Sequence, residues 1–154
     1  MNIAGNYTFN APRENVWELI HTPASLIKII PGCQSVEQIS PVEYRTNIQM
    51  KIPAIVGEYT TYVKLTNFKQ PNYCHFAGEF SGAPGTISGT ASFDLFEEDN
   101  QQTRIEFRGQ GLITGPLARL NDRFAEGIAK TLISQGLAQL DKQLQQQMAT
   151  KEVV

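Results

Sequence analysis

Two cysteines and two histidines are the side chains of this sequence with the clearest capacity for chemistry. Cys33 follows a Pro-Gly turn in the stretch IKIIPGCQS, and Cys74 precedes His75 in YCHFAGEF. A catalytic thiol needs a base to take its proton and a third group to orient that base. His21 could approach Cys33, whereas His75 has the opposite parity to the apolar residues of its segment, and we interpret both histidines as surface residues. Cys33 is therefore expected to be a small, half-apolar residue at a folded corner.

The spacing of the remaining candidate ligands does not favour a metal or nucleotide site. Cys33 and Cys74 are far apart in the sequence, with no Cys-x-x-Cys motif and no pair of histidines four residues apart. The acidic run 97–99 lies in an expected hairpin turn and does not have the pattern of a calcium-binding loop. In GQGLITG, residues 109–115, the third glycine comes one residue too late for a dinucleotide fingerprint, and no second parallel strand follows. We expect no metal and no cofactor.

Length and charge restrict the remaining classes of function. The 154 residues fit one domain, which we place at residues 1–148, with a frayed tail at 149–154 where the apolar stripe is lost. The net charge of −2, without runs of like charge, argues against nucleic-acid binding. No apolar segment approaches the roughly 18 residues needed to span a bilayer, and the N-terminus does not have the pattern of a signal peptide. We therefore expect a cytoplasmic protein with at most peripheral contact at the inner face of the membrane.

Hydrophobic periodicity predicts an α+β domain. Residues 3–9 alternate as a strand, and Pro12 and Pro23 each begin a short helical segment. From Cys33 onward the period is two, and turns rich in Gly, Pro or Asn separate the apolar runs of an antiparallel meander. After Gly115-Pro116 the spacing changes to that of a helix of some thirty residues, about 45 Å long. The prediction is a curved sheet of about seven strands wrapped around a long C-terminal helix.

The inward face of this sheet mixes aromatic residues with glycines. Gly78, Gly89, Gly109 and Gly111 share the face of the large apolar side chains, and small residues there could leave a ligand cavity unfilled. A fully packed core, in which the glycines only bend the sheet, explains the pattern equally well. Tyr44, Tyr59 and Thr61 are the main polar members of this face. The predicted cavity lining is Ile48, Met50, Tyr59, Phe76, Phe80, Ile87, Ala91, Phe93, Phe107, Leu117, Leu120, Phe124 and Ile128.

Four motifs in order resemble one protein family. GNYTFNAPRENVW, IIPGC, GAPGTISGTA and PLARLNDRFAEGIAKTL are similar to the family of the CoxG subunit of carbon monoxide dehydrogenase, within the START-like SRPBCC superfamily. The resemblance covers Gly5 to about Leu140. It implies a helix-grip fold enclosing a hydrophobic cavity, and an accessory role beside a molybdenum-containing hydroxylase. The family has no settled catalytic motif to transfer, so no catalytic residue is predicted.

Three functions remain open on these grounds. The first is a non-catalytic carrier of a hydrophobic small molecule or lipid, with an isoprenoid quinone as one candidate. The second is a docking, assembly or membrane-recruitment factor for a carbon monoxide dehydrogenase-type molybdenum hydroxylase, using the charges of Arg119, Arg123, Lys130, Asp122 and Glu126 on the last helix. The third, which we favour least, is a small cyclase or hydrolase, which would require facing polar residues inside the cavity.

Overall fold

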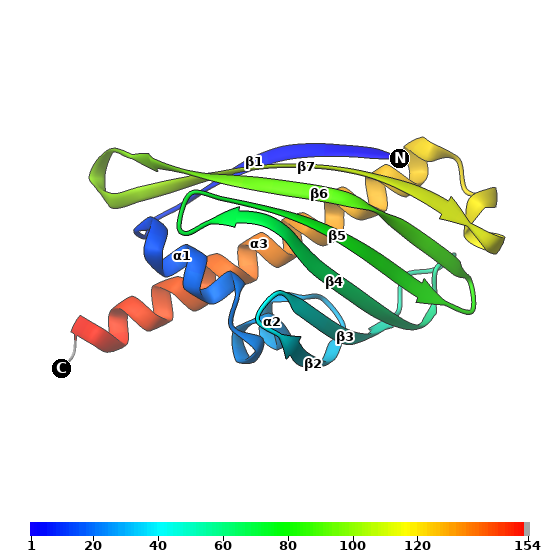
Figure 1. Ribbon diagram of the computed structural model, residues 1–154, viewed down its shortest axis with the longest axis horizontal. Coiled ribbons are helices and arrows are strands. Elements are labelled where there is room, and N and C mark those ends of the chain that lie inside the picture. The colour runs from blue at the N-terminus through cyan, green and yellow to red at the C-terminus, as the bar shows by residue number, and fades with distance from the viewer. Residues whose placement is uncertain (153–154) are drawn as a thin grey trace.

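The structure, a computed structural model, describes residues 1–152 and places a long helix across one face of a seven-stranded antiparallel sheet (Figure 1). The strands are β1 (Asn2–Phe9), β2 (Cys33–Ser40), β3 (Glu43–Met50), β4 (Gly57–Lys69), β5 (Tyr73–Gly82), β6 (Gly85–Glu98) and β7 (Gln102–Thr114). The helices are α1 (Arg13–Ile20), α2 (Pro23–Ile29) and α3 (Asp122–Glu152), with short 3-10 turns η1 (Asp99–Gln101) and η2 (Gly115–Arg119). The predicted α+β helix-grip fold, with two short helices after the first strand, is confirmed.

The sheet order is β1-β7-β6-β5-β4-β3-β2, so every strand from β2 to β7 pairs with its neighbour in sequence. Short connections between consecutive strands permit this arrangement, as the turn residues predict. β1 closes the other side of the sheet by pairing with β7, and Gly5 lies opposite Phe107. Helices α1 and α2 connect the two edge strands β1 and β2, and they lie near the C-terminal half of α3 (Figure 1).

The long helix begins later and ends later than the sequence predicts. Leu117 belongs to η2, and Leu120 lies in the connection after it, so neither is part of α3. The backbone N–H of Phe124 donates to Oδ1 of Asn121 at 2.7 Å, which caps the first turn of α3. At the other end, the predicted frayed tail is helical through Glu152. Residues 153–154 of that tail lie outside the described residues.

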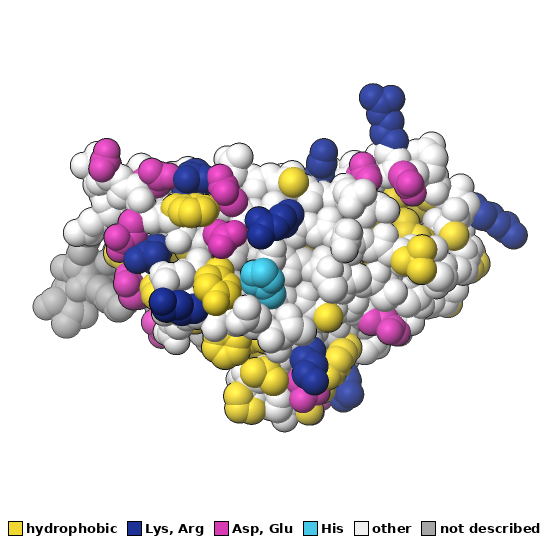
Figure 2. Space-filling view, turned by 45° about the horizontal axis from the view of Figure 1, so that its top comes forward, with side chains coloured by type: hydrophobic (Ala, Val, Ile, Leu, Met, Phe, Trp, Pro, Cys, Tyr) yellow, Lys and Arg dark blue, Asp and Glu magenta, His cyan; other side chains and the backbone are white. Residues whose placement is uncertain are grey.

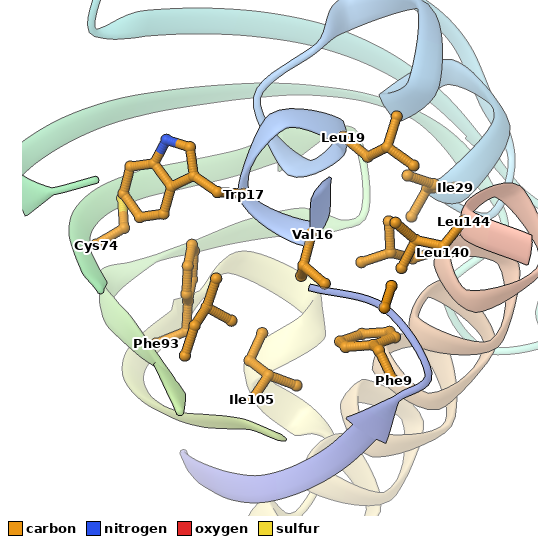
Figure 3. Close-up of a cluster of buried hydrophobic side chains, with 12 residues drawn as sticks. Phe9, Val16, Trp17, Leu19, Ile29, Cys74, Phe93, Ile105, Leu140 and Leu144 are labelled. Atoms are coloured by element: carbon orange, nitrogen blue, oxygen red, sulfur yellow. The ribbon is translucent and has the colours of Figure 1, made fainter. Parts of the chain in front are cut away.

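The core is divided into two clusters. The larger one joins α1, β1, β5, β6 and the C-terminal half of α3, with Phe9, Val16 and Leu144 fully buried (Figure 3). The smaller one surrounds Tyr59 and Leu117 at the opposite end of the sheet. Between the two clusters, the sheet face carries glycines, so no large side chain joins them there. This division determines where the site forms.

Candidate ligand cavity

Three adjoining cavities lie on the inner face of the sheet, and together we call them the apolar channel. The η2 segment, about 240 Å³, is lined chiefly by Met50, Phe80, Ile87, Leu117, Leu120, Ile128 and Leu132. The glycine segment, about 230 Å³, is lined by residues that include Thr61, Val63, Phe76, Gly78, Gly89 and Gly111. The α2 segment, about 340 Å³, is lined by residues that include Ile29, Tyr44, Thr46, Cys74, Phe93, Ile133 and Leu137. The segments share lining residues, so they lie next to one another along the sheet.

A row of glycines forms the floor of the middle segment. Gly78, Gly89 and Gly111 are register partners on β5, β6 and β7. A Cβ built on Gly89 would collide with the backbone oxygen of Gln110, so the close approach of strands requires glycine there. A Cβ on Gly78 would instead meet Val63 at 3.6 Å, which is an ordinary contact. Gly78 therefore leaves open a volume that a side chain could occupy.

Small residues on α3 line the η2 and α2 segments on the side opposite the sheet. Ala125, Ala129 and Gly136 are among the helix residues that line the channel. Because these side chains are short, the helix can cross the sheet without filling the space between them. Ile133 lines both the η2 and the α2 segments, so it lies where the two meet.

The structure places the predicted lining residues in three environments. Those that line the channel are Met50, Phe76, Phe80, Ile87, Ala91, Phe93, Leu117, Leu120 and Ile128. Ile48 and Tyr59 are buried in the smaller core cluster, and Phe107 packs against the larger one. Phe124 is 48% exposed, because α3 begins at Asp122 and turns this side chain outward. Val63, Ile133 and Leu137 were not among the predicted residues.

The tyrosine hydroxyls on the inner face of the sheet are already hydrogen-bonded. Tyr59 donates to the carbonyl of Ile55 at 2.8 Å and stacks on Phe80 with 4.2 Å between ring centroids. The hydroxyl of Tyr44 donates to the carbonyl of His21 at 3.2 Å. By contrast, the buried hydroxyls of Thr46 and Thr61 have no partner within the structure. Thr61 was expected on this face, and Thr46 follows from the same alternation.

His21 differs from its expected position. It is partly buried, lines the α2 segment and stacks on Trp17 with 4.3 Å between ring centroids. Burial lowers the pKa of His21, partly offset by the bond between Nδ1 and the Trp17 carbonyl. A carbonyl can only accept, so Nδ1 carries the proton of the neutral ring. His75 is exposed, as predicted.

Neither cysteine has the surroundings of a nucleophile. Cys33 begins β2 after Gly32 and is partly buried, and burial raises the pKa of its thiol. Cys74 is 1% exposed, and burial raises its pKa to about 11. A raised pKa keeps both groups as thiols at neutral pH, whereas a nucleophile is a thiolate. No group of three or more potential metal ligands occurs within residues 1–152.

The outer surface carries charges of both signs. Basic and acidic side chains are interspersed over the face shown in Figure 2. Several ion pairs lie on strands at the surface, such as Arg45 with Glu37 at 3.7 Å and Arg108 with Asp94 at 3.6 Å. In the part of the chain that is described, no helix is long and apolar enough to cross a membrane.

Comparison with known proteins identifies the family. The family model of CoxG, a subunit of carbon monoxide dehydrogenase, matches residues 5–145. The chain belongs to the CoxG family. A conserved protein from Geobacillus kaustophilus is 27% identical, with a TM-score of 0.91, over 95% of this chain and 96% of that one. A comparison with curated proteins gave no match.

More distant solved structures share the fold of this CoxG-family chain. A START superfamily protein from Mycobacterium smegmatis has a TM-score of 0.74 at 8% identity, over 94% of this chain and 97% of that one. The protein XoxI from Bacillus cereus has a TM-score of 0.69 at 17% identity, over 93% and 94%.

Proposed function

We propose that this CoxG-family protein is a non-catalytic carrier that binds a hydrophobic small molecule or lipid between the sheet and α3. The observation that carries the proposal is the apolar channel, three adjoining cavities with the glycine row at the middle one, between the two core clusters. An ordinary core closes such gaps because empty space forfeits packing energy. Here the glycines of the sheet and the small residues of α3 keep the space open from both sides.

The energetics favour an apolar ligand of moderate size. Removing about 300 Å² of apolar ligand surface from water contributes several kcal/mol at roughly 25 cal/mol per Å², before the costs of association. An isoprenoid quinone is one candidate, since it combines an apolar tail with an uncharged head. The family name refers to a subunit of carbon monoxide dehydrogenase, which supports our proposal that the ligand is delivered to an enzyme of that molybdenum hydroxylase type.

Uptake of a neutral fluorescent probe tests the carrier function. We expect N-phenyl-1-naphthylamine to bind the wild-type protein with enhanced fluorescence, and solvent extraction followed by mass spectrometry to recover a co-purifying apolar compound. Gly78→Leu places a side chain in the glycine segment and should weaken probe binding about tenfold or more, the effect of losing roughly 1.4 kcal/mol.

Ala77→Leu is the matched control, because Ala77 lies next to Gly78 on the same strand and points to the opposite face. It should bind the probe within about twofold of wild type. The carrier proposal fails if the folded wild-type protein neither retains an apolar compound nor binds the probe. It also fails if Gly78→Leu and Ala77→Leu behave alike.

The enzyme partner requires a separate experiment. Arg119, Arg123 and Lys130 make no ion pair within residues 1–152, so these charges are available to a partner. If they form the docking surface, Arg119→Glu with Arg123→Glu should abolish co-purification with the hydroxylase and leave probe binding intact. Loss of probe binding with retained co-purification would contradict this assignment.

A further inference from the structure

Two threonine hydroxyls stand unpartnered inside the apolar channel. Thr46 is 5% exposed, and its Oγ1 has no hydrogen-bond partner within the protein. Oγ1 of Thr61 is likewise buried and unpartnered. Leaving a buried hydroxyl without a partner is costly, because the group gives up its bond to water and gains nothing. Valine has almost the same shape as threonine and would avoid this cost. The presence of threonine at both positions therefore suggests that the hydroxyls have a function.

A third buried threonine, Thr103, has a hydroxyl that is hydrogen-bonded within the protein. Thr103 is fully buried on β7, and its Oγ1 donates to the carbonyl of Ala11 at 2.7 Å. That bond ties the start of α1 to the sheet. Thr46 and Thr61 make no comparable bond, even though they lie on regular strands surrounded by side chains.

The two hydroxyls lie side by side at the centre of the channel. Thr46 on β3 and Thr61 on β4 are direct register partners, which places their Cβ atoms about 5 Å apart. Thr61 lines the glycine segment and Thr46 lines the α2 segment. Apolar space therefore extends from the pair in both directions along the sheet.

The other polar residues near this point do not compete to donate to a ligand. His21 also lines the α2 segment, but its neutral ring donates its one N–H to the Trp17 carbonyl. The hydroxyls of Tyr44 and Tyr59 are engaged with backbone carbonyls. Glu79, Thr90 and Gln110 contribute to the glycine segment but are exposed to solvent. Within the described lining of the three segments there is no lysine or arginine.

We propose that Thr46 and Thr61, after a rotation about χ1 that turns each covered Oγ1 toward the channel, form its polar anchor and together bind the oxygen of a neutral carbonyl group in an otherwise apolar ligand. The inference rests on the carrier function proposed above. A carbonyl oxygen has two lone pairs and can accept from both hydroxyls at once. A carboxylate would have to be desolvated here without a cation to pair with it, so an ionised headgroup does not fit. The anchor thus selects a ketone, ester or quinone over a fatty acid or a pure hydrocarbon.

Three probes of equal chain length test this selectivity. Undecan-6-one carries its carbonyl in the middle of two apolar arms, undecane lacks the carbonyl, and undecanoate carries a charge. Their affinities are measured by displacement of N-phenyl-1-naphthylamine from the wild-type protein and from the Thr46→Val, Thr61→Val double variant. We expect the wild type to bind the ketone about three- to tenfold more tightly than the alkane, and undecanoate most weakly.

The double variant should keep the affinity of wild type for the alkane and bind the ketone more weakly than the alkane, because the buried carbonyl then has no donor. Its melting temperature without ligand should equal or exceed that of wild type, since two unpaired buried hydroxyls are removed. Thr103→Val is the control and should lower the melting temperature. A ratio of ketone affinity to alkane affinity that is the same in wild type and double variant, or preference for undecanoate, overturns the anchor and leaves the carrier function standing. If none of the probes binds, both proposals fail.

Discussion

The imidazole of His21 packs with Trp17 and Phe93 at the α2 segment, with 4.3 Å and 6.4 Å between the respective ring centroids. Burial lowers its pKa, so the folded protein holds a neutral ring at pH 7. The unfolded chain binds the proton more readily than the folded one. As pH falls through the ordinary histidine pKa of about 6.5, the unfolded state gains protons first and stability decreases.

The resulting prediction concerns the pH dependence of unfolding. The free energy of unfolding of the wild-type protein should decrease from pH 7.5 to pH 5.5, a window above the ordinary pKa values of carboxyl groups. His21→Gln should show a smaller decrease, because the group with the lowered pKa is gone. Urea denaturation at several pH values measures the difference, and the exposed His75→Gln serves as the control. A His21→Gln slope equal to that of wild type would show that His21 does not carry this dependence.

The two cysteines should differ in thiol reactivity and in the effect of a serine substitution on the free energy of unfolding. At pH 8, the folded protein should react with one equivalent of a thiol-specific reagent, slowly and at Cys33, and the unfolded protein with two. Cys33→Ser should change the free energy of unfolding by less than about 0.5 kcal/mol. Cys74→Ser should cost about 1–3 kcal/mol, since it buries a hydroxyl in the larger core cluster. Two fast equivalents in the folded state would contradict the burial of Cys74.

At the scale of elements, two glycines with different surroundings should respond oppositely to alanine. Gly127 is exposed on α3, and an added Cβ would meet no atom within 4 Å. Gly127→Ala should therefore stabilise the protein by about 0.5–1 kcal/mol through helix propensity. Gly32 has a φ of +75°, and its Cβ would strike the backbone oxygen of Gln49. Gly32→Ala should destabilise by about 1–3 kcal/mol, measured by thermal unfolding. The same sign for both variants would refute this account.

The strands could be predicted because their alternation is strict, whereas the start of α3 could not be placed from apolar spacing. Pro116 fits the first turn of a helix, and Leu117 and Leu120 continue the apolar pattern, yet they belong to η2 and its connection. The signal for the true start was Asn121-Asp122, a capping residue followed by an acid. That offset explains why Phe124 was expected in the cavity. Small residues such as Ala125 and Ala129 were missed because a search for apolar bulk does not find them.

The sheet face that α3 covers could be predicted only in part. Thr46 and Thr61 are ordinary β-branched strand residues by propensity. Only the structure shows that they are register partners with unpartnered hydroxyls, in contrast to Thr103. Periodicity assigns a residue to a face, but hydrogen-bond satisfaction depends on the neighbouring strands.

Across the whole molecule, packing is uneven along α3. Its C-terminal half carries Leu140 and Leu144, both essentially fully buried against the larger core cluster (Figure 3). Its N-terminal half covers the η2 segment, and there Phe124 is 48% exposed. Val56, next to Ile55 in the lining of that segment, is also exposed. Regions with few buried contacts open at low free energy, so ligand should enter at this end.

Amide hydrogen exchange along the single helix α3 tests this gradient. Without ligand, amides in residues 125–133 should exchange at least tenfold faster than those in 137–146, because local opening there breaks fewer buried contacts. Saturating N-phenyl-1-naphthylamine should slow exchange chiefly in 125–133, since a ligand in the η2 segment stabilises the closed helix. Residues 137–146 act as the internal control and should change little. Uniform exchange along α3, or protection confined to its C-terminal half, would place the opening elsewhere and exclude the η2 end as the route into the channel.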